Sequence, residues 1–204
     1  HFHWRIHLLT ALLVFGSISI VLGAEPSEYI LSNGMKVLLV EVPKAPVATV
    51  QVWYKVGSRN EVMGRAGLSH MLEHMMFKGT ARYPKGSFSR IVRKNGGIDN
   101  AFTGQDFTAY FENVAADRVG LALELEADRM QGLLLDHSEF QTERDVVKEE
   151  RRLRSEDDPQ GALVEALFAQ AFLSHPYHWP VIGWFADLDA MSLEDLQRHY
   201  ETFY

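Results

Sequence analysis

The sequence predicts an α+β fold, in which helices pack on one face of an antiparallel-rich sheet. Most of the strand-like segments lie before residue 116, and long amphipathic helices dominate the chain after it. Strands followed by helices are typical of this class, because the helices then cover a sheet that neighbouring strands have formed. The chain has 204 residues, of which 47% are hydrophobic and 23% charged, so it can bury the core of one globular domain.

The composition excludes several classes of function. There is no cysteine, which rules out a disulfide scaffold, a thiol nucleophile and every zinc site built on sulfur. The formal net charge is -7, so the chain lacks the basic surface that nucleic-acid binding requires, and we expect no nucleic-acid partner. Any metal ion would therefore be held by histidine and carboxylate side chains.

Residues 1–24 have the pattern of a signal peptide. Arg5 precedes an apolar run over residues 8–24, which ends in the small residues Gly23 and Ala24. We expect cleavage near Ala24 and export of the mature chain, to the periplasm if the source is bacterial. The alternative is an uncleaved membrane anchor formed by residues 8–24. In either case the folded domain should cover residues 25–204.

From residue 25 onward the expected elements follow one another without a linker or repeat. Asn33-Gly34 between two apolar runs predicts a hairpin over residues 29–42. The alternation over residues 47–56 predicts a third strand beside that hairpin. Gly79 is a typical helix stop after the first expected helix. We expect helices over 67–78, 88–94, 117–134, 138–155, 161–172 and 192–204, and strands over 98–103 and 107–114.

The first of these helices carries a candidate metal motif. His70 and His74 are four residues apart, so their rings project from one helix face and can chelate a metal together. Glu73 lies about 60° around the helix from His70, where its carboxylate could reach a water on the same metal and act as a general base. The alternative is an ordinary pair of surface or core histidines, and a third ligand would decide between them.

Candidates for that third ligand lie in the acidic segment 143–150. Zinc hydrolases typically use three protein ligands, and two histidines with one glutamate are an established set. Glu143 and Glu150 share a helix face, whereas Glu149 is rotated by about 100° from Glu150, so one carboxylate could ligate while another supports it. The alternative is a solvated helix face, because residues 148–152 form a charge run suited to ion pairs along a helix.

These motifs together resemble those of the pitrilysin and insulinase family, which includes mitochondrial processing peptidase and bacterial relatives. Residues 70–74 match the inverted zinc motif of the inverzincins. The resemblance extends over nearly all of residues 28–204. Its other blocks are Gly57-Ser58-Arg59, Phe77-Lys78-Gly79-Thr80, residues 96–103 with Asp106, Thr108 and Tyr110, His175-Pro176-Tyr177, and Val181-Ile182-Gly183.

The resemblance implies a role for each candidate residue near the metal. One Zn²⁺ per catalytic domain would be held by His70, His74 and Glu150, with Glu73 as the general base. Glu143, seven positions before Glu150, would orient the ligands or the water.

The resemblance also implies a mode of substrate binding. Asn100 and Ala101 would lie on an edge strand to which a substrate peptide adds as a further strand. Phe77 and Phe102 would line the pocket for the side chain that follows the cut bond. Without the resemblance, Asn100 could equally be a turn residue after Gly96-Gly97, and the two phenylalanines could be plain core residues.

The expected function is zinc-dependent endopeptidase activity on peptides or unfolded segments. Family members enclose the substrate between two related halves, and this chain resembles the N-terminal catalytic half only, shortened at its C-terminal end. A second half, in the same chain or as a partner subunit, is therefore expected for full activity. A membrane is a partner only if the N-terminal segment remains uncleaved.

Two rival functions fit parts of the pattern. A non-catalytic peptide-binding subunit of a two-chain peptidase would keep the fold, but such relatives normally lose a ligand or the base, and His70, Glu73, His74 and Glu150 are all present. The thioether-cleaving lyase of quorum signalling carries the same short zinc motif. Its third ligand is a cysteine, which this chain does not contain.

Overall fold

The computed structural model describes residues 25–204, which form two compact units, residues 25–45 and Pro46–Tyr204. Residues 1–24, where the sequence predicts a signal peptide, lie outside the described residues, so that expectation stays a prediction. Among residues 25–204 no helix combines the length and the apolar composition that a membrane crossing requires.

The first unit is the predicted antiparallel hairpin. Its strands β1 (Ser27–Ile30) and β2 (Lys36–Leu39) pair along their whole length. Gly34 has a φ of +85° in the connecting turn, a left-handed conformation that glycine adopts at little cost. The Asn33 side chain accepts a hydrogen bond from the Met35 N–H at 3.1 Å. The Asn-Gly signal therefore located the turn correctly.

The second unit contains a three-stranded antiparallel sheet in the order β3-β5-β4. Its strands are β3 (Val47–Tyr54), β4 (Ile98–Thr103) and β5 (Thr108–Ala115). The three strands were predicted, but the sequence did not identify β5 as a partner of β3. Alternation of apolar residues shows which face of a strand is buried and does not identify its neighbour.

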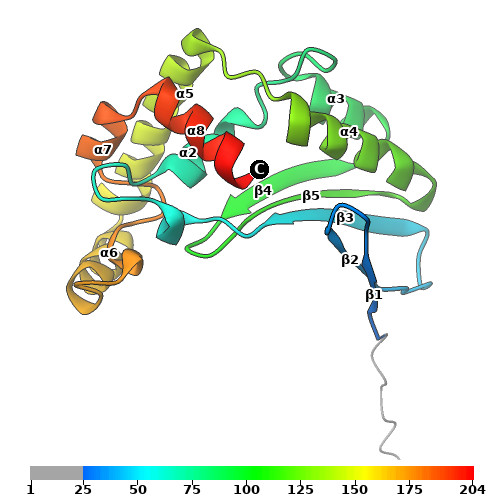
Figure 1. The fold of residues 1–204 in the computed structure, drawn as a ribbon, viewed down its shortest axis with the longest axis horizontal. Coiled ribbons are helices and arrows are strands. Elements are labelled where there is room, and N and C mark those ends of the chain that lie inside the picture. The colour runs from blue at the N-terminus through cyan, green and yellow to red at the C-terminus, as the bar shows by residue number, and fades with distance from the viewer. Residues whose placement is uncertain (1–24) are drawn as a thin grey trace, which may run out of the picture. The chain divides into compact units, whose positions relative to one another are not determined.

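Helices cover one face of this sheet, as the α+β prediction requires (Figure 1). In Figure 1 α3 and α4 lie over one end of the strands, and α2 and α8 lie over the other. The helices are α2 (Leu68–Met75), α3 (Ser87–Lys94), α4 (Val119–Gly132), α5 (His137–Arg151), α6 (Pro159–Ala171), α7 (Phe185–Ala190) and α8 (Leu193–Phe203). Short 3₁₀ turns are η1 (Ser58–Asn60), η2 (Ala116–Arg118) and η4 (Pro176–His178).

The long helices agree with the prediction apart from their ends. The segment expected as one helix over 138–155 stops being α-helical at Arg151 and continues as a π-helical turn, η3 (Arg152–Glu156). The six-residue helix α7 was not predicted, because it is too short to show a period. The helix expected over 67–78 ends at Met75, three residues earlier than the sequence suggested.

The core lies between the sheet and these helices. Met71, Leu72 and Met75 of α2 are fully buried, and they pack with Tyr110 of β5. A second apolar cluster joins α3, α4 and the far end of β5, and consists of Phe88, Val92, Val114, Ala122 and Leu125. Burial of α2 along this whole side fixes which of its faces points away from the core.

A cluster of three buried charged side chains links α4 to β5. The Arg129 guanidinium donates to Glu126 at 2.8 Å and lies 3.4 Å from a Glu112 carboxylate oxygen, and all three side chains are almost completely buried. The same guanidinium sits over the rings of Tyr110 and Phe77, at 4.4 and 5.2 Å from their centroids. Arg129 thus fixes Phe77, which lies just beyond the end of α2.

The start of α2 is held by contacts from outside the helix. The buried Glu61 carboxylate accepts hydrogen bonds from the backbone N–H groups of Gly67 and Ser69, both at 2.7 Å. These groups are donors that a helix leaves unsatisfied at its N-terminus. On the other side, Ser69 Oγ lies 3.1 Å from His199 Nε2 of α8. The position of α2 is therefore set by its capping contacts as well as by its apolar face.

His199 should make the stability of the domain depend on pH. Burial lowers its pKa from 6.5 to about 4, so the folded state holds this ring neutral where an unfolded chain would already protonate it. The stability that this neutral ring contributes is fully present above about pH 6.5. As the pH falls toward 4, the free energy of unfolding decreases by up to about 1.4 kcal/mol per pH unit. Denaturant unfolding of the protein between these pH values measures this loss.

The matched variants for this measurement are His199→Gln and His137→Gln, since His137 is exposed. The first should flatten the pH dependence of the unfolding free energy, and the second should leave it unchanged. Parallel curves for wild type and His199→Gln would contradict the prediction. A ring-proton NMR titration of His199 in the wild type gives the pKa directly, even if the variant folds poorly.

Candidate metal centre

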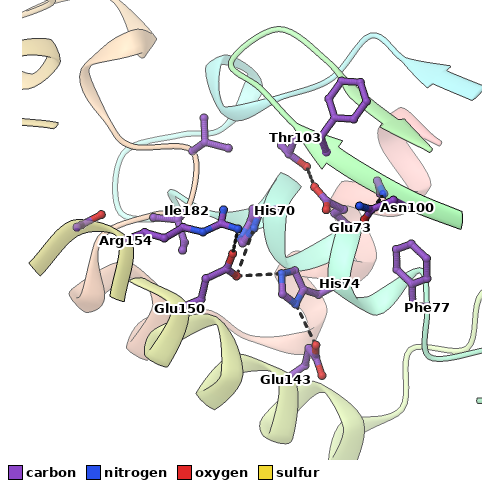
Figure 2. Close-up of a pocket in the computed structure, with 14 residues that line it drawn as sticks. His70, Glu73, His74, Phe77, Asn100, Thr103, Glu143, Glu150, Arg154 and Ile182 are labelled. Atoms are coloured by element: carbon purple, nitrogen blue, oxygen red, sulfur yellow. Dashed lines mark hydrogen bonds and ion pairs between the residues drawn. The ribbon is translucent and has the colours of Figure 1, made fainter. Parts of the chain in front are cut away.

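All nine residues selected from the sequence line one cavity of about 630 Å³, shown in Figure 2. They come from α2 and the short segment that follows it, from β4, and from α5. The nine are His70, Glu73, His74, Phe77, Asn100, Ala101, Phe102, Glu143 and Glu150.

Two helices bring the candidate metal ligands together. Glu150 Oε2 of α5 lies 3.2 Å from His74 Nε2 and 3.7 Å from His70 Nε2, both of α2. One ligand atom from each of the three residues lies within 4.8 Å of the other two. Two imidazole nitrogens and one carboxylate oxygen are a donor set that zinc accepts while leaving a further coordination position open.

The surroundings of Glu150 fit a cation at this point. Glu150 Oε2 is buried without a hydrogen bond of good geometry, although both histidine nitrogens face it. Buried polar atoms are nearly always partnered in native proteins, and a carboxylate oxygen left without a partner is costly. A divalent ion between the three side chains would satisfy this oxygen and use both rings as ligands.

Glu143 orients His74 and does not join the three candidate ligands. Its Oε1 lies 2.9 Å from His74 Nδ1, and its Oε2 forms an ion pair with Lys78. A histidine that bonds a carboxylate through one ring nitrogen presents the other to a metal in a fixed direction. Here the carboxylate holds Nδ1, and Nε2 faces Glu150.

Glu149 is excluded as a ligand by its position. Its side chain is 59% exposed and forms an ion pair with Arg152 at 2.6 Å. The solvated-face interpretation of the charge run is thus correct for Glu149 and wrong for Glu150, which points into the cavity (Figure 2). Rotation around α5 separates the two neighbouring glutamates.

The two histidines differ in their electrostatic surroundings. Burial, together with the neighbouring His74, lowers the pKa of His70 to about 4. Burial also acts to lower the pKa of His74, but hydrogen bonds to Glu143 and Glu150 outweigh it and raise the value to about 9. In the absence of a metal, His74 is therefore the ring that holds positive charge between the two carboxylates.

Glu73 sits beside the ligands and is held by β4. The Thr103 hydroxyl donates a hydrogen bond to Glu73 Oε2, and Figure 2 shows the Glu73 side chain directed from α2 toward Thr103. Burial raises the pKa of Glu73, although the Thr103 hydrogen bond acts in the opposite direction. This carboxylate therefore has the strongest tendency to take up a proton among the three in the cavity.

The residues expected to bind substrate lie on one side of the cavity. Among the described residues, β4 pairs only with β5, so its other edge is free. Asn100 is within β4 opposite Phe111, so the turn interpretation of Asn100 is wrong. Its side chain accepts a hydrogen bond from the Ala101 N–H at 2.9 Å.

The two phenylalanines differ in how far they belong to the core. Phe77 is partly buried and packs against the main apolar cluster, so the core interpretation holds in part. Phe102 is 41% exposed and contacts Trp53 and Phe107, with ring centroids 5.6 and 5.9 Å away. Both rings also line the cavity.

Sequence reasoning gave no site role to five residues of the cavity wall, although three of them stand in the family motif blocks: Thr103, Val181 and Ile182, with Arg154 and Ser155 outside those blocks. Arg154 stands four residues after Glu150, so helix periodicity could have found it. Ile182 has no such local signal. Its loop meets the start of α2 so closely that a Cβ on Gly67 would lie 2.7 Å from the Ile182 carbonyl oxygen.

Comparison with known proteins identifies relatives of this chain. The insulinase family, peptidase family M16, matches residues 36–183. Zinc protease PqqE of Helicobacter pylori is 43% identical over 175 residues, which are 85% of this chain and 39% of that protein. A probable mitochondrial-processing peptidase subunit beta of Arabidopsis thaliana is 33% identical over 174 residues, covering 85% of this chain and 33% of that protein.

A solved structure agrees with the architecture. The crystal structure of a protease from Helicobacter pylori superposes with a TM-score of 0.86 at 42% identity, covering 89% of this chain and 44% of that one. This match confirms the predicted α+β class. The chain spans about two fifths of the length of the curated relatives it matches.

The three candidate ligands predict a metal-dependent gain in stability that neighbouring residues do not share. After chelation, adding Zn²⁺ at about 100 times its dissociation constant should raise the unfolding free energy by about 2.7 kcal/mol. Glu150→Ala should abolish this gain, because it removes one of three ligands. Glu149→Ala is the matched control and should retain it. Equal zinc stabilisation of both variants, measured by thermal unfolding, would show that Glu150 is not a ligand.

Proposed function

The chain belongs to the insulinase family, peptidase family M16, as its motifs predicted, and on that premise we propose that it is the catalytic half of a zinc endopeptidase. Its substrates would be peptides or unfolded segments. Relatives named zinc protease support this proposal. The observation that carries it is the convergence of two imidazoles and a carboxylate beside the partly buried Glu73 carboxylate in one cavity.

In this proposal His70, His74 and Glu150 hold one Zn²⁺. The bound ion would act as a Lewis acid on the scissile carbonyl group and on the attacking water. Glu143 keeps the His74 ring in the orientation that directs Nε2 toward the metal, and Lys78 balances the charge of Glu143. The protein's own part in this centre is to hold three ligand atoms in place before the substrate arrives.

Glu73 acts as the general base in the proposed reaction. Thr103 occupies Oε2 of its carboxylate, which leaves Oε1 to take the proton from the attacking water. The same group then delivers that proton to the leaving amine. A raised pKa supports both steps, since a stronger base accepts the first proton more readily and is still protonated when the amine departs.

We propose that the substrate backbone binds along β4. The free edge of this strand offers backbone donors and acceptors near Asn100 and Ala101, to which an extended peptide can add. Phe77 and Phe102 would contact the side chain that follows the cut bond. Because the main chain supplies most of this interaction, selection by sequence would be loose.

A second half is proposed to complete the enzyme, either in the same polypeptide or as a partner subunit. The relatives are more than twice as long as this chain, which leaves room for such a half. For the N-terminal segment we propose export, to the bacterial periplasm, with residues 1–24 as a cleaved signal. An anchor formed by residues 8–24 is the alternative.

Replacing Glu73 separates metal binding from catalysis. Glu73→Gln should retain zinc, since Glu73 is not among the three ligand residues, and should lower peptide hydrolysis by about 10²–10⁴-fold because the base is lost. The assay uses the full-length protein with a quenched fluorescent peptide, and zinc is measured in parallel. Undiminished turnover would refute the role of Glu73. Zinc-loaded wild type without any hydrolysis would instead favour a non-catalytic peptide-binding subunit.

Thr103 should act as a positioning residue for Glu73. Thr103→Val removes the hydroxyl while keeping a similar shape, and we expect kcat to fall by roughly tenfold with little change in KM, because the base is less well aligned. Thr103→Ser keeps the hydroxyl and should restore most of the rate. A shared loss in both variants, or a change confined to KM, would argue for a packing role of Thr103.

A further inference from the structure

One wall of the cavity carries an arginine that the proposed mechanism does not use. Arg154 lies in the π-helical turn η3, directly after α5, and its side chain is 71% exposed. Its guanidinium forms an ion pair with Glu150 Oε1 at 2.8 Å. Figure 2 shows it reaching over Glu150 toward His70.

The contacts between α2 and α5 place Arg154 at one end of the ligand group. Glu143 faces His74 and Lys78, and Glu150, two turns further along α5, faces His70 and His74. The two helices therefore run in opposite directions. Arg154 follows Glu150 along the chain and therefore lies beyond His70, at one end of the cavity. Phe77 follows His74 along the chain and lies at the opposite end. A bound peptide that crosses the metal would have a basic group at one end and an aromatic ring at the other.

The Glu150 carboxylate leaves most of the Arg154 guanidinium available. Oε2 of Glu150 faces the histidines, and only Oε1 faces Arg154 Nη2. Within residues 25–204 this is the one ion pair that Arg154 forms. A guanidinium presents several N–H donors in a planar fork, which matches a second carboxylate with two parallel hydrogen bonds.

The charges of the cavity make this the favoured place for a substrate carboxylate. Arg154 is the only lysine or arginine among the lining residues, whereas Glu73, Glu143 and Glu150 are all acidic. An acidic side chain beside these glutamates would meet like charges, which costs binding free energy, and in the zinc-loaded protein the other side chains of the wall are uncharged. At the Arg154 end it would meet an opposite charge.

We propose that Arg154 forms a carboxylate-binding subsite, which selects peptides with an acidic side chain on the opposite side of the cut bond from Phe77. This inference rests on the proposed peptidase function and adds a substrate class to it. Because Phe77 is assigned to the side chain after the cut, Arg154 faces the residues before it. The preferred substrates carry Asp or Glu N-terminal to the cut.

Binding of matched peptides tests this subsite without requiring turnover. The full-length zinc-loaded protein carrying Glu73→Gln is titrated with fluorescent peptides in which a single Glu moves along a neutral sequence, each paired with its Gln analogue. At one position the Glu peptide should bind roughly tenfold more tightly than the Gln peptide. Arg154→Gln, added to the same background, should bring that ratio close to one, and Arg154→Lys should keep part of it.

The control variant is Arg152→Gln. Arg152 lies in the same π-helical turn and pairs with Glu149 in a similar way, but it does not line the cavity. It should leave the Glu-to-Gln ratio unchanged. Damage transmitted through Glu150 to the zinc site would weaken both peptides of a pair alike, so the ratio reports the subsite alone.

Two results would overturn the inference. One is that the Glu73→Gln protein with Arg154 intact binds Glu and Gln peptides equally well at every position. The other is that its preference for Glu persists unchanged when Arg154→Gln is added. The peptidase proposal fails on a different measurement, which is the absence of hydrolysis by zinc-loaded protein with Glu73 intact. A preference that depends on Arg154 in a protein without hydrolysis would support the subsite and refute the peptidase function.

Discussion

The candidate centre depends on the packing of α2 against α5, with His74 at the point where the two helices meet. Glu143 contacts one nitrogen of its ring at 2.9 Å and Glu150 lies 3.2 Å from the other. Seven residues separate the two glutamates, nearly two turns of helix, so a straight α5 presents both to the same ring. A small rotation or shift of either helix would separate the ring from one carboxylate, and the ligand group would lose its geometry.

This packing requires that α2 is fixed both in its position along its own axis and in its rotation about that axis. Several independent contacts fix it. The buried methionines set the rotation, while Glu61 satisfies the N–H groups at the start of the helix. Gly67, the residue just before α2, has a φ of +96° and lies so close to Gly183 that neither could carry a side chain without displacing backbone. That approach also brings the 180–183 loop to the cavity. The same contacts thus position the helix and build one wall of the site.

The sequence predicted what local periodicity encodes, and it failed where tertiary pairing decides. His70, Glu73 and His74 follow from one helical turn, and spacing alone left Glu143, Glu149 and Glu150 as alternatives that only the packing of α5 could separate. The pairing of β3 with β5 was not predicted, because alternation defines a face and not a neighbour. The loop at Ile182 was noted only as a family motif, and its contact with α2 was not predicted, since nothing in its own residues marks that contact. Family motifs covered part of this gap, because they record long-range contacts indirectly.

The environments of the three carboxylates suggest why only one of them is suited to move a proton. Bonds to His74 and Lys78 outweigh burial and lower the pKa of Glu143, and contact with His74 lowers that of Glu150, which Arg154 also pairs. Glu73 has no cation as a direct partner, only the Thr103 hydroxyl, and burial raises its pKa. Carboxyl groups driven apart in this way take different chemical roles. In the proposed enzyme Glu143 and Glu150 would stay ionised to orient and hold the metal, and Glu73, whose pKa is raised, would take up a proton more readily than either, as the proposed base requires.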